Sequence, residues 1–488
     1  MQGAEKIDPE IERLFTQHVL PTCICKASQI PACGVPTTET SLQLSDNNSR
    51  SGNLGKIQDL LRDIIQMEIN QLPDLTLATF REEYLKLDWE SRQKALLLFA
   101  TQFGVDAARL FEQINKQPCG LKFLVHLRAD LIAAIKEKNL SALHALDADL
   151  KGMFETWVVP ACLELQQITW TNSASVLKTI VVHETTHPVR NLDDLKRRLS
   201  VGRRCYGYFH PEIPGEPVVF IELALTNKLE GSIQNVLYGE PPLAEEVATT
   251  AIFYALTHSQ TGLAGIDLGS FLLREVITVL RQDRPSIQNF CTLSPINGFS
   301  KWLLPKLESQ IRFAQVDSRS SQDIDGAPAF KENLLLPEEE DILVKACSEF
   351  SGGGKSRSGL QIIRELLTSR GHEWTKSAKV AAALRAPLMR LCARYLILEK
   401  KDGRPLNLVT HLHVWNGASV ERLNWMADTS TKGIEQSAGI MVTYIYRLEN
   451  LDTNKQLYLN KGIISVSPAI QQYLHGLVYN EKEEMQLS

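Results

Sequence analysis

The chain has 488 residues and a net charge of -5, from 52 basic and 57 acidic side chains, so it has no general electrostatic attraction to nucleic acid or to an anionic membrane. Its length exceeds what one hydrophobic core usually serves, and 44% apolar with 22% charged residues is ordinary globular composition. We therefore expect two or more domains, with neither nucleic acid nor a membrane as a partner.

The cysteines and the first residues of the chain indicate the cellular compartment of the protein. Nine scattered cysteines are too few and too irregular for a disulfide scaffold, which favours a reducing compartment. No run approaches the roughly 18 to 20 apolar residues of a membrane span, and the acidic residues near the start are atypical of a targeting signal. We expect a cytoplasmic protein, with mitochondria or peroxisomes as the alternative if a targeting segment is missing from this sequence.

The first third of the chain is predicted to be an arm followed by helices. Residues 31–53 are rich in Pro, Ser, Thr, Asn and Gly, so residues 1–53 are expected to form a flexible arm. Cys23, Cys25 and Cys33 within it supply three of the four ligands of a zinc site, which makes metal binding the less favoured alternative there. From Leu54 to about Gln166 the apolar period is helical, and we place an all-helical domain at residues 54–185.

The remainder, residues 186–488, contains both strands and helices, and with the all-helical domain before it we expect an α+β protein. The β-branched and aromatic runs predict strands at 204–209, 218–225, 251–257, 287–292, 409–414 and 440–448. The apolar periods of 3.6 predict helices at 270–281, from 299 onward, and at 338–350, 360–367 and 378–400.

Residues 183–187 read His-Glu-Thr-Thr-His, the H-E-x-x-H spacing that places two imidazoles on one helix face to hold zinc. Pro188 disfavours the α conformation at the residue before it, so His187 is not expected to continue a helix. No third ligand follows at a recognised spacing. We interpret the motif as a domain-boundary loop and expect no metal.

Two glycine-rich segments could bind phosphate. Residues 351–358, SGGGKSRS, imitate the end of a P-loop but follow a predicted helix and lack the first glycine, so a flexible connection is the favoured interpretation. Residues 251–280 are more specific, because a strand leads through Gly262, Gly265 and Gly269 directly into an amphipathic helix. Backbone amides and the helix dipole at such a turn favour an anion, although a turn with no ligand is the commoner case.

Two polar residues stand out near the ends of predicted strands. Ser294 lies in CTLSPINGF and His413 lies in THLHVWNG. Taken alone, Ser294 is more often a turn-forming serine and His413 a satisfied core histidine, but strand ends are also where sites gather. There is no G-x-S-x-G elbow at Ser294, which argues against an ordinary serine hydrolase.

Several long blocks of the chain resemble the malonyl-CoA decarboxylase family. The similarity runs from about Leu54 to Leu474. It is densest in KRRLSVGRRCYGYFHPEIPGEPVVFIELALT (196–226), in 251–280, TLSPINGF (292–299), PLMRLCARYLILEK (387–400) and NGASVERLNWMAD (416–428). The resemblance implies a helical oligomerisation domain, a GNAT-like mixed-sheet catalytic domain with helices on both faces of the sheet, a homo-oligomer expected to be a tetramer, and no cofactor.

The resemblance also implies the site residues. The catalytic serine and histidine fall on Ser294 and His413, and the acyl-CoA pyrophosphate falls on the turn Ala264, Gly265, Ile266, Asp267, Leu268, Gly269 and Ser270. Ala264 and Asp267 depart from the R/Q-x-x-G-x-G/A pattern of acetyltransferases. Tyr446 is expected to orient His413 in the substrate site. The implied reaction is decarboxylation of malonyl-CoA to acetyl-CoA; an acyl-CoA-dependent N-acyltransferase and a non-catalytic acyl-CoA-binding regulator are the alternatives.

Overall fold

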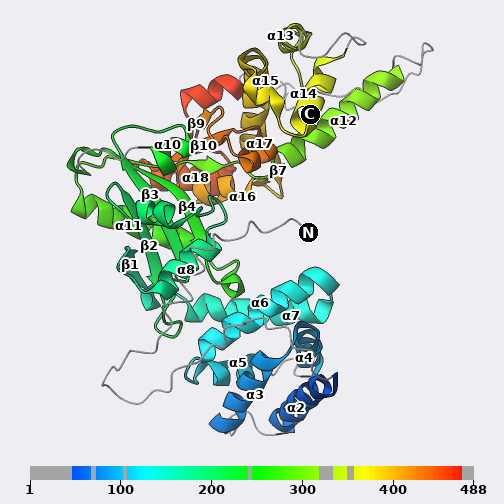
Figure 1. The fold of residues 1–488 in the computed structure, drawn as a ribbon, viewed down its shortest axis with the longest axis vertical. Coiled ribbons are helices and arrows are strands. Elements are labelled where there is room, and N and C mark those ends of the chain that lie inside the picture. Colours follow the sequence, from blue (N-terminus) through cyan, green and yellow to red (C-terminus); the bar gives the residue numbers. More distant parts are fainter. Residues whose placement is uncertain are drawn as a thin grey trace. The chain divides into compact units, whose positions relative to one another are not determined.

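The computed structural model describes residues 47–66, 73–102, 107–239, 245–317, 333–348 and 357–474. These residues form two compact units (Figure 1). The first contains the residues up to 200 with 204–222 and 256–276, and the second contains 201–203, 223–255 and the described residues from 277 onward. Cys23, Cys25 and Cys33, with the rest of the predicted arm up to residue 46, lie outside the described residues.

The first unit begins with six helices: α2 (Asn47–Gln66), α3 (Asp74–Lys86), α4 (Trp89–Gln102), α5 (Ala107–Asn115), α6 (Gly120–Lys138) and α7 (Ser141–Trp157). They confirm the predicted helical N-terminal region, but α2 begins at Asn47, so residues 47–53 are helical and not part of a flexible arm as expected. Helix α6 carries its buried leucines at helical spacing and ends at Asn139, whose left-handed backbone stops the helix. Buried rings hold the bundle together, with Phe99 stacked on Phe111 at 5.3 Å between centroids.

The rest of the first unit contains η3 (Pro160–Cys162), β1 (Glu164–Ile168), α8 (Ala174–His183), α9 (Leu192–Arg198), most of β2 (Arg203–Phe209), the start of β3 (Val219–Thr226), the end of β4 (Thr250–His258), η5 (Thr261–Leu263) and the first turns of α11 (Gly269–Asp283). Strand β1 was not predicted, because the helical assignment was carried on to about Gln166. Its five residues pair antiparallel with β2, which supplies the backbone partners that a local pattern does not show.

The second unit contains the remaining strands and helices. They are α10 (Ile233–Tyr238), η4 (Glu245–Val247), β5 (Asn289–Thr292), β6 (Ser294–Pro295), α12 (Phe299–Asp317), α13 (Pro337–Cys347), α14 (Gly359–Thr368), η6 (Glu373–Lys376), α15 (Ala378–Ile397), β7 (Lys400–Lys401), β8 (Arg404–Pro405), α16 (Leu408–Trp415), β9 (Ser419–Asn424), α17 (Thr431–Ser437), β10 (Met441–Ile445) and α18 (Leu451–Lys461). Strands β7 and β8 form a separate two-stranded sheet.

The main sheet is mixed. Its order is β1-β2-β3-β4-β5-β10-β6, with β9 also pairing with β10. Strand β4 is parallel to β5, whereas β10 is antiparallel to β5, β6 and β9. The parallel pair is joined through α11, as parallel neighbours require a crossover. A helical region followed by a mixed sheet with helices confirms the predicted α+β class.

One predicted element has the wrong type. Residues 409–414 were expected to form a strand, but they lie inside helix α16. The Asn407 side chain accepts a hydrogen bond from the Thr410 backbone N–H and so caps the first turn of this helix. The alternation of Val, Thr, His and Leu imitates a strand, and the cap decides against it.

Most of the glycine-rich segment 351–358 lies outside the described residues. Its last residue, Ser358, caps α14 by accepting from the Gln361 N–H. Among the described residues, no helix is both long and apolar enough to cross a membrane.

Candidate active site

Ser294 is held at the end of strand β5 by the sheet itself. It begins β6, and its pairing with Val442 of β10 fixes its backbone. The side chain is only 7% exposed, and its hydroxyl donates a hydrogen bond to Thr292 Oγ1 at 3.0 Å. The Ser294 hydroxyl is therefore buried and points toward Thr292.

His413 reaches the same place from helix α16. Its Nε2 lies 3.4 Å from Ser294 Oγ, and its Nδ1 lies 2.6 Å from the hydroxyl of Tyr446, the residue after β10. The structure thus brings together Ser294, His413 and Tyr446, three residues singled out in the sequence. Along the chain, His413 lies 119 residues after Ser294 and 33 residues before Tyr446.

Burial gives His413 an unusual protonation state. Desolvation lowers the pKa of His413 to about 3, because no opposite charge compensates for removing an imidazolium from water. The ring is therefore neutral near pH 7, with one N–H donor and one acceptor nitrogen. Since Ser294 donates its proton to Thr292, it accepts from Nε2–H, and Nδ1 then accepts from Tyr446.

Two further residues belong to this cluster and were not found from the sequence. The ring of Tyr444 packs against the ring of His413, with centroids 4.4 Å apart. Thr292 Oγ1 accepts from Ser294 and also from the Tyr444 N–H. Both residues lie in strands that were predicted, but strand alternation alone does not show which of two buried faces carries the chemistry.

The predicted pyrophosphate turn lies in the first unit, between η5 and α11. The side chains of Ile266 and Leu268 are buried, whereas Ala264, Gly265 and Asp267 are exposed. Asp267 Oδ1 accepts from the Ser270 N–H at 3.2 Å, so this carboxylate already occupies one amide of the helix start. Within the described residues, the amides of Gly265, Asp267, Gly269 and Phe271 make no hydrogen bond to protein, which leaves donors at the positive end of α11.

A buried arginine from the helical region shapes this turn. Arg128 of α6 is 2% exposed, and its Nη1 donates to the carbonyl oxygens of Gly262 and Ala264 at 2.7 and 2.9 Å. Its Nε donates to Asp147 at 2.8 Å. Gly262 is required for this packing, because a Cβ there would lie 1.9 Å from the Val125 carbonyl oxygen. Arg128 was not predicted from the sequence, because it lies more than 130 residues before the turn.

The H-E-x-x-H motif does not form a two-histidine helix face. Helix α8 ends at His183, Glu184 is already extended, and His187 lies beyond the helix, as expected for His187. The Glu184 carboxylate accepts from the His187 N–H at 2.8 Å and from Thr257 Oγ1 at 2.7 Å. Its oxygens therefore serve to join the loop to β4.

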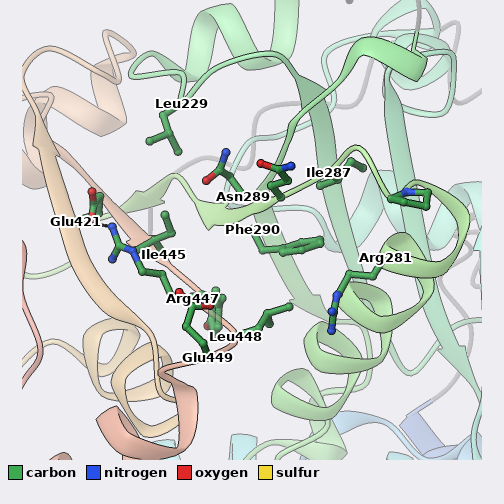
Figure 2. A pocket seen from close by; sticks show the side chains of 13 residues that line it. Leu229, Arg281, Ile287, Asn289, Phe290, Glu421, Ile445, Arg447, Leu448 and Glu449 are labelled. Carbon is green, nitrogen blue, oxygen red and sulfur yellow. Dashed lines mark hydrogen bonds and ion pairs between the residues drawn. The ribbon is translucent and has the colours of Figure 1, made fainter.

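A cavity of about 660 Å³ lies in the second unit, at the Asn289 end of β5. Figure 2 shows side chains that line it. Phe290 and Ile445 form part of its wall, and Arg281 stands at its side. Its other arginine, Arg447, is paired with Glu421 at 2.9 Å. Of the predicted site residues Tyr446 lines it, whereas Ser294 and His413 do not.

Comparison with known families covers nearly all of the chain beyond α2. Residues 77–158 match the model for the malonyl-CoA decarboxylase N-terminal domain, and residues 161–485 match that for the malonyl-CoA decarboxylase C-terminal domain. The chain belongs to the malonyl-CoA decarboxylase family. Membership confirms the family resemblance, and it makes the chain a decarboxylase, a carboxy-lyase.

Individual members of the malonyl-CoA decarboxylase family agree with this assignment. The mitochondrial malonyl-CoA decarboxylase of Anser anser anser is 38% identical over 378 residues, which is 76% of this chain and 70% of that protein. The mitochondrial enzyme of Rattus norvegicus is 37% identical over 412 residues, 82% of this chain and 78% of that protein. The crystal structure of malonyl-CoA decarboxylase from Agrobacterium vitis is 28% identical, covers 86% of this chain and 99% of its own, and has a TM-score of 0.70.

Proposed function

We propose that this decarboxylase converts malonyl-CoA to acetyl-CoA and CO2, using Ser294, His413 and Tyr446. The observation that carries the proposal is the buried hydrogen-bonded chain in which His413 lies between Ser294 and Tyr446. Family membership supports the substrate, since the relatives are named malonyl-CoA decarboxylases. The scheme uses side chains and backbone amides alone, without a metal or cofactor.

In the first step Ser294 stabilises the charge that develops on the thioester. The bond between the carboxylate carbon and C2 of the malonyl group breaks, its electron pair moves toward the thioester oxygen, and CO2 leaves. The Ser294 hydroxyl turns from Thr292 to donate to that oxygen, and a donor of this kind is worth most in a site that excludes water. The 7% exposure of Ser294 satisfies that condition.

In the second step His413 protonates C2 of the enolate. A histidine with a pKa of about 3 does not act as an imidazolium near neutral pH, so the proton comes from the neutral ring at Nε2–H. A thioester enolate is a stronger base than an imidazolate, which makes the transfer downhill. As Nε2 loses its proton, the Tyr446 hydroxyl stabilises the charge on the ring through its hydrogen bond to Nδ1, and a proton from solvent then restores Nε2–H.

The turn 264–270 is proposed to hold the pyrophosphate of the acyl-CoA. Free amides of Gly265, Gly269 and Phe271 at the start of α11 are suited to phosphate oxygens. The carboxylate of Asp267 would repel an anion, but its Oδ1 is bound to the Ser270 N–H, which offsets part of its charge.

Incubation of the purified protein with malonyl-CoA alone tests the proposal. Release of CO2 with equimolar acetyl-CoA is the expected result. Acyl transfer that appears only when an amine is added would instead identify an N-acyltransferase, and binding without turnover would identify a regulator. Ser294→Ala should lower kcat by roughly 10² to 10³, the usual cost of losing one oxyanion donor, and a normal kcat would remove Ser294 from the scheme.

The assembly and the compartment belong to the same proposal. We assign the helical region, α2 to α7, to homo-oligomerisation, with a tetramer as the expected state, which light scattering of the purified chain tests. The relatives from goose and rat carry mitochondrial names, which supports the mitochondrial alternative over a cytoplasmic location for this chain. Fractionation of cells that produce it distinguishes the two.

A further inference from the structure

A single buried amide joins the loop that follows Ser294 to the helix that carries His413. Asn407 is 2% exposed and precedes α16. Its Nδ2 donates to the backbone carbonyl of Asn297 at 2.9 Å, and its Oδ1 accepts from the Thr410 N–H at 2.8 Å. One side chain therefore fixes the start of α16 against the backbone three residues after Ser294.

The Asn297 carbonyl that accepts from this amide is itself held in place. It accepts a second hydrogen bond from the Tyr395 hydroxyl at 2.9 Å. The next residue, Gly298, has a φ of +87°, and a Cβ there would lie 2.7 Å from that same hydroxyl. The backbone after Ser294 is thus held by two buried donors and by a conformation that favours glycine.

The connection continues from Asn407 to the imidazole ring. Thr410 Oγ1 lies 3.2 Å from Asn407 Oδ1 and 2.7 Å from the Tyr444 hydroxyl. The Tyr444 ring packs on His413 with 4.4 Å between centroids. Tyr444 and Thr410 are both fully buried. These connected contacts therefore set the position and tilt of the His413 ring as well as the position of its helix.

We infer that Asn407 is a positioning residue that sets the contact between Ser294 and His413; this inference rests on the proposed function. The Ser294 Oγ to His413 Nε2 distance of 3.4 Å is already long for a hydrogen bond, so a small shift of α16 breaks it. An amide is needed at residue 407, because the position must donate on one side and accept on the other. Aspartate offers only the acceptor, and serine lacks the second group.

The exchange Asn407→Asp tests the inference with little change of shape. It keeps the helix cap but sets a carboxylate oxygen against the Asn297 carbonyl oxygen with no proton between them. We expect kcat to fall roughly 10- to 100-fold, the effect of displacing a reacting group by a fraction of an ångström to one ångström. The KM for malonyl-CoA should stay within about threefold of the wild-type value, because substrate binding is left intact.

Asn454→Asp is the matched control. Asn454 also donates to a backbone carbonyl, that of Gly417 at 3.0 Å, and accepts from a hydroxyl, that of Ser465 at 2.8 Å, but it has no bond to the loop after Ser294. Its kcat should remain within about threefold of wild type. Equal losses in the two variants would overturn the inference, since the effect would then not depend on the Asn297 bond.

A second variant and a second measurement keep the inference testable if Asn407→Asp does not fold or the wild type proves inactive. Tyr395→Phe removes only the other donor to the Asn297 carbonyl and should also lower kcat, with KM unchanged; a normal kcat would contradict the inference.

Nitrogen-15 NMR of His413 reports the contact between Ser294 and His413 without any turnover. In the wild type the Nε2 proton should exchange slowly, and in Asn407→Asp its signal should shift and broaden, whereas an unchanged signal would overturn the inference.

Discussion

The hydroxyl of Tyr446 lies 2.6 Å from Nδ1 of His413, while the opposite nitrogen of the same ring faces Ser294. A neutral imidazole has only one proton, so whichever group donates to Nδ1 decides that Nε2 carries it. In the scheme we propose, Tyr446 therefore directs the His413 proton toward Ser294. This relationship makes the phenol hydroxyl part of the chemistry we propose.

Tyr446→Phe removes that hydroxyl and leaves the ring. We expect kcat to fall roughly 10- to 100-fold, below the 10² to 10⁴ typical of losing the acid itself, with KM little changed. Steady-state kinetics with malonyl-CoA measure both. The matched control is Tyr458→Phe, because Tyr458 makes the same kind of bond to His411 Nδ1 at 2.7 Å. If both variants lose the same activity, the hydroxyl of Tyr446 has no special role.

His413→Ala should change the isotopic record of the reaction. In deuterated water the wild type should place one deuteron on C2 from one face, because a fixed ring reaches only one side of the enolate. The variant should be slower by roughly 10² to 10⁴, and its residual product should lose stereospecificity as water supplies the proton. Chirally labelled malonyl-CoA with NMR analysis of the acetyl group reports both.

His411→Ala serves as the control for that experiment. Two residues on an α-helix are about 200° apart, so His411 points away from His413, and it bonds Tyr458 instead. Stereospecificity should remain intact. If His411→Ala loses stereospecificity while His413→Ala keeps its rate and its stereospecificity, the acid is His411 rather than His413.

The low pKa of His413 makes stability depend on pH. The native ring stays neutral down to about pH 3, whereas the ring of the unfolded chain binds a proton below about 6.5. Unfolding is therefore favoured as pH falls from 6.5 toward 3, and His413 alone should account for about 2 kcal/mol at pH 5. Urea unfolding of the wild type and of His413→Asn at pH 7 and pH 5 measures the difference, and the same loss in both would contradict the assignment.

The same pKa predicts a feature of the kinetics. His413 stays neutral between pH 5 and 8. Any inflection of kcat/KM near pH 6.5 should therefore remain when His413 is replaced. An inflection that disappears on replacing His413 would mean that the free protein carries a titrating imidazole at this position.

Arg128→Lys should act on substrate binding. One ammonium group cannot replace a guanidinium that reaches Gly262, Ala264 and Asp147 together, so the turn before α11 should loosen. We expect KM to rise about tenfold or more, with kcat changed less than about threefold. Asp147→Asn, which keeps both carbonyl contacts, should have a smaller effect, and a fall in kcat at constant KM would argue against a role in holding the acyl-CoA.

Local patterns in the sequence predicted most of the helices and strands, the glycine turn and the end of α8 before His187, because apolar period and the rule for a residue before proline act within a few residues. They marked Ser294 and His413 as polar residues near the ends of predicted strands, and only the family resemblance gave these two residues a catalytic role. The tertiary structure decided that Tyr446, Asn407 and Arg128 meet partners 33, 110 and more than 130 residues away. Such contacts depend on how the strands and helices close around a shared core, and no periodicity along the chain specifies which distant donor will face which acceptor.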